Sequence, residues 1–450
     1  MSLSIANFVR TQALSSNLKA GPASCRLKLC YTDTMKLSEE LAWRGFVNQT
    51  TYKDLNALDG EPITFYLGVD PSADSMTVGN LAIMMLVRRF TDHGHKAILL
   101  VGGATGLIGD PDGKKQERDL KSVEQVEHNK KALAAQFKQV LNGVDFETVD
   151  NYDWFKGIGY LEFLRDIGKH VPMRQMLGRE FVQSRLSDEG EGISYAEFSY
   201  ALIQGYDFLH LHREKGATLQ LAGADQWGNS IAGVELIRRI TGDEAHVWTA
   251  PLVVNKTTGV KFGKSEAGAV WLDAAKTTPT QFYQFWINGD DAGAEDYLKI
   301  YTLLDKAEID AVMAKHREAP SKRVAQLRLA KEVTELVHGP EAAHTARLVT
   351  SVLVGAHPVG GAAADVLTAL RQEIPALSGP ATGSVVDALV ASGLASSNTE
   401  ARRFIKDNAI SVNGRKIQRE NFEAGDFQNG RLLLRRGKAF KDSALVELEG

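Results

Sequence analysis

Residues 96–113 read KAILLVGGATGLIGDPDG, an apolar run that ends in a glycine-rich turn. An apolar run without polar alternation is typical of a strand buried on both faces of a parallel sheet. Residues 63–69, ITFYLGV, form a second such strand, which Asp70-Pro71 ends. Residues 81–90 between the two strands have helical spacing. The order strand, helix, strand predicts an α/β fold with a parallel, Rossmann-like sheet.

The same alternation continues along the chain. Residues 217–221 and 247–254 have the composition of strands, and residues 230–240 between them that of a helix. Ser122 and Gln125 stand at capping-box spacing before another long helix. Ligands of parallel sheets bind beyond the carboxyl ends of the strands. We therefore expect the functional residues in the segments that follow these strands.

The chain of 450 residues is long enough for several domains. The pattern predicts an N-terminal extension (1–34), a catalytic α/β domain (35–255), a loop with two lysines (256–277), a helical domain (278–353), a linker (354–383) and a small C-terminal module (384–450). In the last of these, Asn413-Gly414 is a hairpin signal. No apolar run is long enough to span a bilayer, so no membrane is expected.

Composition narrows the class of protein. The chain is 44% hydrophobic with a net charge of −4, so nucleic-acid binding would need a local basic patch. Cys25 and Cys30 are the only cysteines, which excludes a disulfide framework or a cysteine-based zinc site in the folded body. The extension 1–34 is basic and has no acid before Asp33. It is either a transit peptide or the result of a start codon placed upstream of Met35; we expect a cytoplasmic protein.

Two glycine-containing loops have compositions that suggest phosphate or nucleotide binding. Residues 261–265, KFGKS, place two lysines and a hydroxyl in a loop suited to polyphosphate, although Thr258 stands where a Walker A loop requires glycine. Residues 102–110 follow a strand but lack GxGxxG spacing because Ala104 and Thr105 occupy the wrong places. These glycines would let the backbone approach a nucleotide closely, and a nicotinamide dehydrogenase is excluded.

Taken in order, several segments resemble the bacterial-type tyrosyl-tRNA synthetases of class I. These segments are 43–50, 66–80, 101–111, 151–154, 198–208, 223–229, 261–265 and 282–288. The resemblance runs from about Met35 to the C-terminus. It implies a homodimer that uses L-tyrosine, ATP with Mg²⁺ and tRNA(Tyr), with no tightly bound cofactor and no protein-held metal.

The resemblance assigns roles to individual positions. The catalytic set that it implies is Thr77, Asn80, Lys114, Arg118, Lys261, Lys264 and Ser265. The implied ATP contacts are Asp70, Ser72, Gly79, Asn80, Gly223, Asp225, Lys261 and Lys264. Thr77 and Asn80 replace the two histidines of the family's His-x-Gly-His signature. This signature opens a helix whose N-terminus is an anion site.

The resemblance also implies the tyrosine contacts. Tyr66 and Asp207 match the pair that contacts the phenol hydroxyl, and Gln226 matches a residue near the carboxylate. The groups around the α-ammonium are Asp110, Tyr200 and Gln204. Asp, Tyr and Gln oxygens are acceptors suited to an ammonium group.

The C-terminal module is similar to a small RNA-binding module shared with a ribosomal protein. Residues 401–438 hold ten basic and four acidic side chains, a net charge of +6. The predicted tRNA contacts are Arg402, Arg403, Lys406, Arg415 and Lys416. Two alternatives stay open: a related tryptophanyl enzyme, which would not need a phenol-binding pair, and an RNA-binding protein that has lost catalysis, which Thr77 favours.

Overall fold

The computed structural model describes residues 35–110, 120–178, 180–187, 192–265, 268–437, 439 and 441–449, and their side chains except at 175, 180, 181, 264 and 265. The extension 1–34 lies outside these residues. The chain divides into two compact units. One contains residues up to Asp273 together with 296–302, and the other contains 274–295 and the chain from Leu303 onward. In the described residues no helix combines the length and apolarity needed to cross a membrane.

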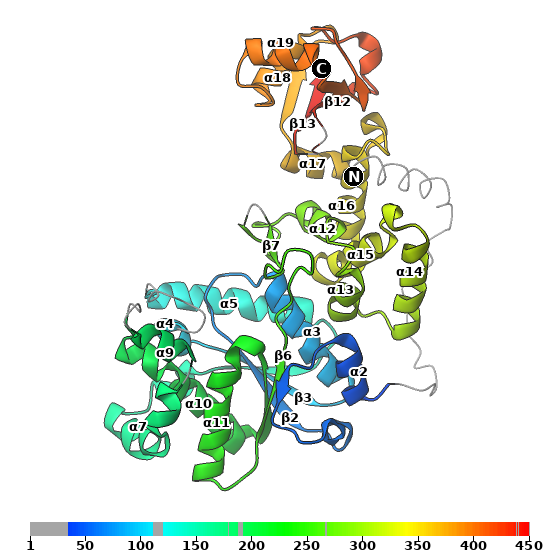
Figure 1. Cartoon of the computed structure of the whole chain (residues 1–450). Helices are drawn as coiled ribbons and strands as arrows, with labels where there is room; N and C mark the ends of the chain where they lie inside the picture. Colours follow the sequence, from blue (N-terminus) through cyan, green and yellow to red (C-terminus); the bar gives the residue numbers. More distant parts are fainter. Residues whose placement is uncertain are drawn as a thin grey trace. The chain divides into compact units, whose positions relative to one another are not determined.

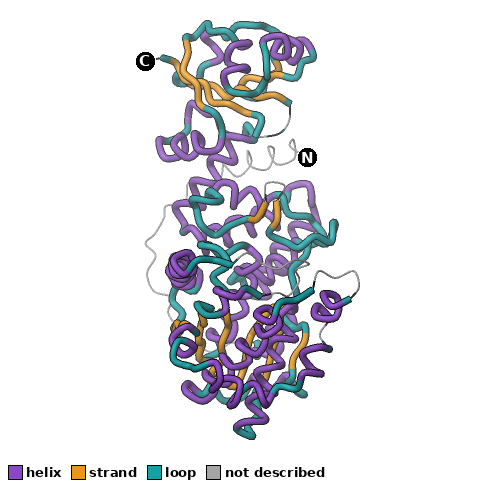
Figure 2. Tube along the Cα trace, turned by 90° about the vertical axis from the view of Figure 1, so that its left-hand side faces the viewer, coloured by secondary structure: helices purple, strands orange, loops and turns teal. Residues whose placement is uncertain are grey.

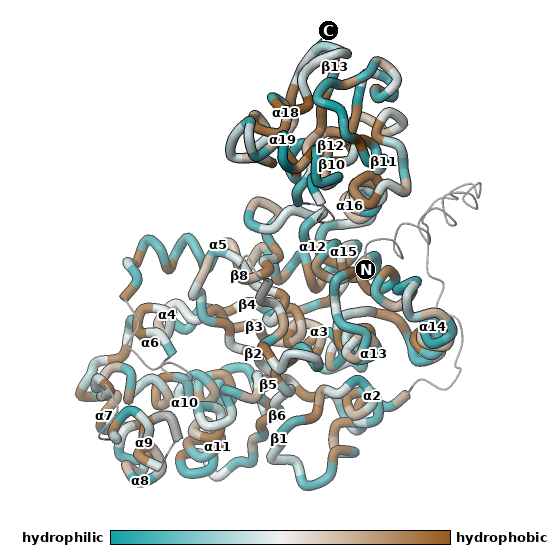
Figure 3. The backbone as a smooth tube through the Cα atoms, turned by 45° about the horizontal axis from the view of Figure 1, so that its top comes forward, coloured by the Kyte–Doolittle hydropathy of each residue, from teal (hydrophilic) through white to brown (hydrophobic). Residues whose placement is uncertain are grey.

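A six-stranded sheet forms the centre of the first unit, in the order β1-β6-β5-β2-β3-β4. Its strands are β1 (Gln49–Thr50), β2 (Thr64–Val69), β3 (Lys96–Val101), β4 (Phe146–Asp150), β5 (Ala217–Gly223) and β6 (His246–Ala250). All neighbours are parallel except β1, which runs antiparallel to β6. The predicted parallel sheet is confirmed. Figure 3 shows the hydrophobic residues that fill its central strands.

Helices cover the sheet on both faces (Figure 1). They include α2 (Leu37–Arg44), α3 (Val78–Asp92), α4 (Thr105–Ile108), α5 (Val123–Val140), α6 (Tyr152–Phe155), α7 (Tyr160–Asp166), α8 (Met173–Leu177), α9 (Glu180–Leu186), α10 (Tyr195–Lys215), α11 (Trp227–Ile240) and most of α13 (Ala294–Tyr301). The predicted capping box of α5 is present, with Gln125 N donating to Ser122 Oγ and Ser122 N to Gln125 Oε1. The strand expected at 247–254 ends earlier, at Ala250, because Pro251 cannot donate to a sheet ladder.

The second unit begins with helices, as predicted for 278–353. They are α12 (Pro279–Ile287), α14 (Lys306–Glu318), α15 (Val324–His338) and α16 (Pro340–Leu353). Arg323 donates from Nε and Nη2 to the carbonyl of Ile287 at 3.0 and 2.6 Å. A cation at the carboxyl end of α12 compensates the orphan carbonyls there.

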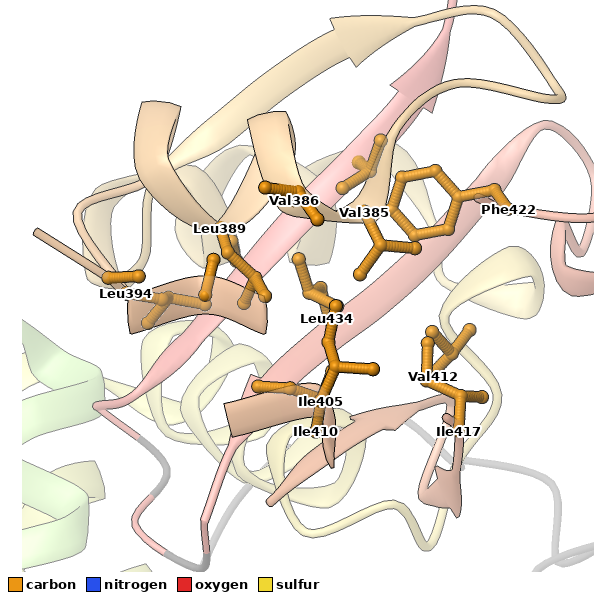
Figure 4. Packing of buried hydrophobic residues seen from close by; sticks show 14 of the residues in the cluster. Val385, Val386, Leu389, Leu394, Ile405, Ile410, Val412, Ile417, Phe422 and Leu434 are labelled. Carbon is orange, nitrogen blue, oxygen red and sulfur yellow. The ribbon is translucent and has the colours of Figure 1, made fainter. Parts of the chain in front are cut away.

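The C-terminal module contains a five-stranded sheet and two helices. Its elements are β9 (Ala376–Gly379), α18 (Val385–Ala391), α19 (Asn398–Lys406), β10 (Ile410–Val412), β11 (Arg415–Lys416), β12 (Arg431–Arg436) and β13 (Ser443–Leu448). The tube in Figure 2 traces these strands as one sheet. Figure 4 shows how Val385 and Leu389 of α18 pack against Ile405 and Leu434. The predicted hairpin is confirmed, with Asn413 at φ 47° between β10 and β11.

The segment 354–383, predicted to be a linker, is folded. It contains α17 (Ala364–Glu373) and β9, which pairs in parallel with β13 at the edge of the C-terminal sheet. Leu367 and Leu370 of α17 are buried with Leu433 and Leu445 of that sheet. The prediction of a linker was wrong because the segment is rich in small residues and proline. The strand that β9 pairs with, β13, comes more than 60 residues later in the chain.

Glycines set the packing of α10 against α11. A Cβ atom at Gly233 of α11 would lie 2.8 Å from Cβ of Phe208 on α10. Phe208 is fully buried. Gly228, in the first turn of the same helix, has no atom within 4 Å of such a Cβ position. Close approach therefore requires glycine at 233 and not at 228.

We expect Gly233→Ala to destabilise the protein by about 1–3 kcal/mol, because overpacking outweighs the better helix propensity of alanine. Gly228→Ala is the matched control, and we expect it to be neutral or to stabilise by up to about 1 kcal/mol. Thermal unfolding of the two variants measures both effects. A stabilised Gly233→Ala protein would contradict the packing described here.

Candidate functional site

A cavity of about 390 Å³ lies at the carboxyl ends of β2, β3, β5 and β6. The strands end there, and the turns after them supply the polar groups, as expected for a parallel sheet. The cavity is lined by the following predicted site residues: Tyr66, Asp70, Ser72, Thr77, Gly79, Asn80, Asp110, Tyr200, Gln204, Asp207, Gly223, Asp225, Gln226 and Lys261. The sheet therefore gathers the predicted tyrosine and ATP contacts in one place. The individual roles stay predictions.

Four of the predicted catalytic residues are not among the described residues that line the cavity. Lys114 and Arg118 lie outside the described residues. Lys264 and Ser265 form the short strand β7, which pairs with β8 (Gly268–Ala269), but only their backbone is described.

The N-terminus of α3 opens onto the cavity. Thr77 is the N-cap residue, and its backbone N and its Oγ1 both donate to Oδ1 of Asn80 at 2.9 Å. Asn80 thus has its carboxamide oxygen occupied, and its amide nitrogen remains the group that can donate to a ligand. The first turn has no acidic residue. A 15-residue helix that begins at a cavity in this way favours an anion at its end.

Two buried polar groups, Asp207 and the hydroxyl of Tyr66, also line the cavity. Asp207 is 2% exposed; its Oδ1 accepts from Trp154 Nε1 at 3.0 Å and its Oδ2 from Asn151 Nδ2 at 3.1 Å. Burial outweighs these hydrogen bonds and raises the pKa of Asp207 to about 8. The hydroxyl of Tyr66 is buried without a hydrogen-bond partner in the described part of the chain. Because this hydroxyl lines the cavity, a ligand or a water molecule in the cavity can supply the missing partner.

Two further carboxylates, Asp70 and Asp110, line the same cavity. Asp70 accepts from Tyr200 Oη at 2.7 Å and from Thr105 Oγ1 at 2.6 Å. Asp110 accepts from Gln226 Nε2 at 2.5 Å. Burial, and then the charge of Asp70, raise the pKa of Tyr200 well above its usual value. Tyr200 is therefore a neutral hydrogen-bond donor, and the carboxylates give this part of the cavity a negative charge.

Glycine is required after β3 for a reason that the sequence did not reveal. A Cβ atom at Gly102 would lie 2.2 Å from Oδ1 of Asp70, and one at Gly103 would lie 2.2 Å from Oδ1 of Asp150. These glycines make room for carboxylates of the protein itself. That they also admit a nucleotide stays a prediction.

Sequence reasoning assigned no role to Asn151, Thr105 or Trp154. Asn151 is fully buried; its Oδ1 accepts from Ala104 N at 2.7 Å and its Nδ2 donates to Thr105 Oγ1 at 3.1 Å, besides Asp207. Asn151 thus joins the turn after β3 to α10. The available signal was that residues 151–154 form one of the segments that carry the resemblance.

The loop of residues 256–277, called here the lysine loop, is joined to the start of α3. Val78 N donates to Val270 O at 3.0 Å, and Leu272 N donates to Met76 O at 2.9 Å. Within the loop, Val270 N donates to Gly263 O at 2.8 Å. These bonds place Lys261 beside the N-terminus of α3 at the cavity.

A basic surface lies on the C-terminal module. Arg402, Arg403 and Lys406 are exposed on α19, and Arg415 and Lys416 are exposed on β11. Arg402 and Arg403 form surface ion pairs with Glu420 and Glu400 at 3.2 and 3.3 Å. Other basic residues of the module are engaged internally: Arg419 with Asp426, Arg431 with Glu447, and Arg436 with Asp442.

Comparisons with known proteins agree with this arrangement. Residues 58–354 match the family model described as tRNA synthetases class I (W and Y), and residues 366–441 match that of the tyrosine–tRNA ligase SYY-like C-terminal domain. The tyrosine–tRNA ligase of Bacillus caldotenax is 46% identical over 395 residues, which cover 85% of this chain and 92% of that protein. The tyrosine–tRNA ligase of Staphylococcus carnosus is 43% identical, with 90% and 98% covered.

Solved structures show the same fold. The C-terminally truncated mitochondrial tyrosyl-tRNA synthetase of Aspergillus nidulans has a TM-score of 0.63 and 27% identity, covering 77% of this chain and 97% of that one. The corresponding Coccidioides posadasii structure has a TM-score of 0.60 and 30% identity, covering 70% and 91%. The matches extend over the sheet, the cavity and the C-terminal module, so this chain belongs to the class I tRNA synthetases of the tryptophan and tyrosine family.

Proposed function

We propose that this protein is a tyrosine–tRNA ligase, which activates L-tyrosine with ATP to tyrosyl-adenylate and transfers the tyrosyl group to the 3′ end of tRNA(Tyr). One observation carries the choice of amino acid. The buried Tyr66 hydroxyl has no hydrogen-bond partner among the described residues and lines the same cavity as Asp207. A phenol hydroxyl both donates and accepts, so it can complete both groups.

The rest of the cavity suits the other end of the amino acid. The α-ammonium group requires acceptors, and Asp70, Asp110 and the buried Gln204 Oε1, which has no partner in the described residues, supply them. Asp70 was predicted as an ATP contact, and its bond to Tyr200 supports a role beside the ammonium as well. Gln226 donates to Asp110 and so orients that carboxylate.

ATP would lie with its phosphates between the N-terminus of α3 and Lys261. No group of three or more His, Cys, Asp or Glu side chains in the described residues could hold a metal ion. Mg²⁺ would bind together with ATP. Its contribution would be to neutralise charge on the leaving pyrophosphate.

The chemistry needs no protein nucleophile. The tyrosine carboxylate attacks the α-phosphate and pyrophosphate leaves, after which a hydroxyl of the terminal tRNA ribose takes the tyrosyl group and releases AMP. The chain contributes by holding the two substrates in line and by stabilising the developing phosphate charge with the α3 N-terminus and the lysine loop.

A tryptophanyl enzyme is the second candidate, because the matching family includes both specificities. Indole has only an N–H donor, so it would leave the Tyr66 hydroxyl without an acceptor. That loss favours tyrosine.

We also propose a cytoplasmic homodimer. Between residues 160 and 195 of the catalytic unit, five large apolar side chains are 51–79% exposed: Tyr160, Leu161, Met173, Leu186 and Tyr195. The hydroxyls of Tyr160 and Tyr195 lie 3.3 Å apart. A second copy of the chain would cover such exposed apolar side chains. The bound tRNA would contact the basic surface of the C-terminal module.

Asp207→Asn is the sharpest test of the amino-acid assignment. We expect the preference for tyrosine over phenylalanine in pyrophosphate exchange to fall roughly 10- to 100-fold, as for the loss of a hydrogen bond to a buried acidic group. Asp153→Asn is the matched control, because Asp153 is exposed and paired with Lys156. An unchanged preference in Asp207→Asn would remove the phenol assignment.

The raised pKa of Asp207 gives a pH prediction with a definite sign. With a pKa of about 8, the free protein holds this proton at neutral pH, and stability falls as pH rises from about 4 towards 8. A phenol that donates to the carboxylate favours its ionised form. Tyrosine binding should therefore release a proton, and tyrosine affinity should rise with pH up to about 8.

Calorimetry near pH 6.5 in two buffers of different ionisation enthalpy measures the number of protons released. Asp207→Asn should release none. No proton release by the unaltered protein would show that Asp207 stays neutral and donates to the ligand instead.

The tRNA assignment is tested by replacing Arg415 and Lys416 together with alanine. We expect the KM for tRNA to rise roughly 3- to 30-fold and the salt dependence of binding to weaken by about two charges, while pyrophosphate exchange is unchanged. Lys53 and Lys96, exposed lysines of the catalytic unit away from the cavity, provide a control of equal charge. Equal losses in both variants would show only a general charge effect.

A further inference from the structure

A cluster of buried charges lies outside the cavity, between α2, α3 and α13. It consists of Glu40 on α2, Arg44 at the end of α2 and Arg89 in the last turn of α3, and we call it the buried charge cluster. Arg44 and Arg89 are 4% and 5% exposed. Figures 1 and 3 show these three helices side by side. Nothing in the proposed chemistry uses these residues, and buried arginines are costly unless they have partners.

The two guanidinium groups hold the carboxyl end of α13. Arg44 Nη1 donates to the carbonyl of Lys299 at 2.7 Å, and Arg89 Nη2 donates to that of Thr302 at 2.6 Å. Carbonyl groups at a helix end lack intrahelical donors and carry the negative end of the helix dipole. Charge-assisted bonds to them therefore fix where α13 ends.

Glu40 makes this arrangement possible. Its Oε1 lies 2.6 Å from Arg44 Nε and 3.7 Å from Arg89 Nε, and its Oε2 lies 2.8 Å from His93 Nε2. Burial alone would raise its pKa, but the His93 hydrogen bond and the two arginine charges outweigh burial and lower the pKa of Glu40 to about 2. A permanently ionised Glu40 compensates the repulsion between the two arginines.

The other side of α13 contacts the lysine loop. The ring of Phe262, between Lys261 and Gly263, stacks on Tyr297 with centroids 4.2 Å apart and an interplanar angle of 26°. Tyr297 Oη also donates to the carbonyl of Val254 at 3.3 Å. Lys256 of the loop forms an ion pair with Asp296. The helix α13 thus contacts the lysine loop at Phe262 and Lys256, and it also contacts Val254, which precedes the loop.

We infer that the buried charge cluster is a positioning device for the lysine loop and that it acts through α13. The inference rests on the proposed function, in which Lys261 neutralises the phosphates of ATP. By fixing the end of α13, the cluster fixes the surface on which Phe262 rests, and so the place of the neighbouring Lys261. None of its three residues lines the cavity, so we expect tyrosine binding not to depend on it.

The test is Glu40→Gln, which keeps the shape of the side chain and removes its charge. We expect adenylate formation at subsaturating ATP to slow roughly tenfold, with the Kd of tyrosine unchanged within about twofold. Glu235→Gln is the matched control, because Glu235 also accepts from two arginines, Arg238 and Arg239, but on the surface of α11. We expect it to leave both quantities unchanged.

A double-mutant cycle distinguishes positioning from a general loss of stability. If the cluster acts through the loop, Glu40→Gln and Phe262→Leu should be less than multiplicative in their effects on adenylate formation. Tyr297→Phe removes the hydroxyl that α13 donates to Val254. It should slow adenylate formation at subsaturating ATP by a smaller factor than Glu40→Gln. This variant tests the inference even where Glu40→Gln fails to fold.

Three results would overturn the inference. The first is a loss of tyrosine affinity in Glu40→Gln as large as the loss in rate. The second is full multiplicativity with Phe262→Leu. The third is a Tyr297→Phe enzyme with unaltered ATP dependence. Pyrophosphate exchange that is absent already in the unaltered protein would instead overturn the proposed function, so the two failures are distinguishable.

Discussion

The hydrogen bonds of Asn151 hold the cavity together. This side chain comes directly after β4 and is fully buried. It accepts from the backbone of Ala104 after β3 and donates to Asp207 on α10. A carboxamide is one of the few neutral side chains that can both accept and donate in a buried place. The turn of one strand and the helix that carries Tyr200, Gln204 and Asp207 are fixed by the same group.

The turn after β3 also depends on two glycines. Gly102 and Gly103 leave space that the carboxylates of Asp70 and Asp150 fill, with both hypothetical Cβ positions only 2.2 Å from an oxygen. Gly103 N donates to Asp150 Oδ1 at 3.2 Å. The glycines thus let two acidic groups lie at the ends of parallel strands: Asp70 lines the cavity, and Asp150 pairs with Lys130. That this turn admits a nucleotide stays a prediction.

The sequence predicted the sheet well because its central strands are continuous apolar runs. The strand at 96–101 was placed correctly, and the strands at 63–69 and 217–221 to within two residues. The edge strand β4, FETVD, was missed, because its residues are exposed or half-buried and have no apolar run. The strand β9, ALSG, was missed because its partner β13 lies far along the chain. Local patterns report burial, and they cannot report a pairing that tertiary structure creates.

The residues of the candidate site were also predicted only in part. The resemblance supplied the residues that line the cavity, but the supporting residues Asn151, Thr105 and Trp154 emerged only from hydrogen-bond geometry. Their role depends on which atoms meet, and a sequence does not contain that information.

Two buried carboxyl groups, Glu40 and Asp207, differ in how the chain compensates their charge. Glu40 and Asp207 are both largely withdrawn from water, yet burial and partners move their pKa values in opposite directions, to about 2 and about 8. Glu40 is surrounded by two arginines and a histidine, so its charge is fully compensated within the chain. In the part of the chain that the structure describes, Asp207 accepts only from the neutral donors Asn151 and Trp154, and the hydroxyl of Tyr66, which lines the same cavity, has no partner. A protein that folds without compensating such a group keeps an unfavourable contribution to its stability. In the proposed function, a ligand that donates to Asp207 would supply the missing compensation. The location of the two groups agrees with this proposal, because Asp207 lines the cavity and Glu40 does not.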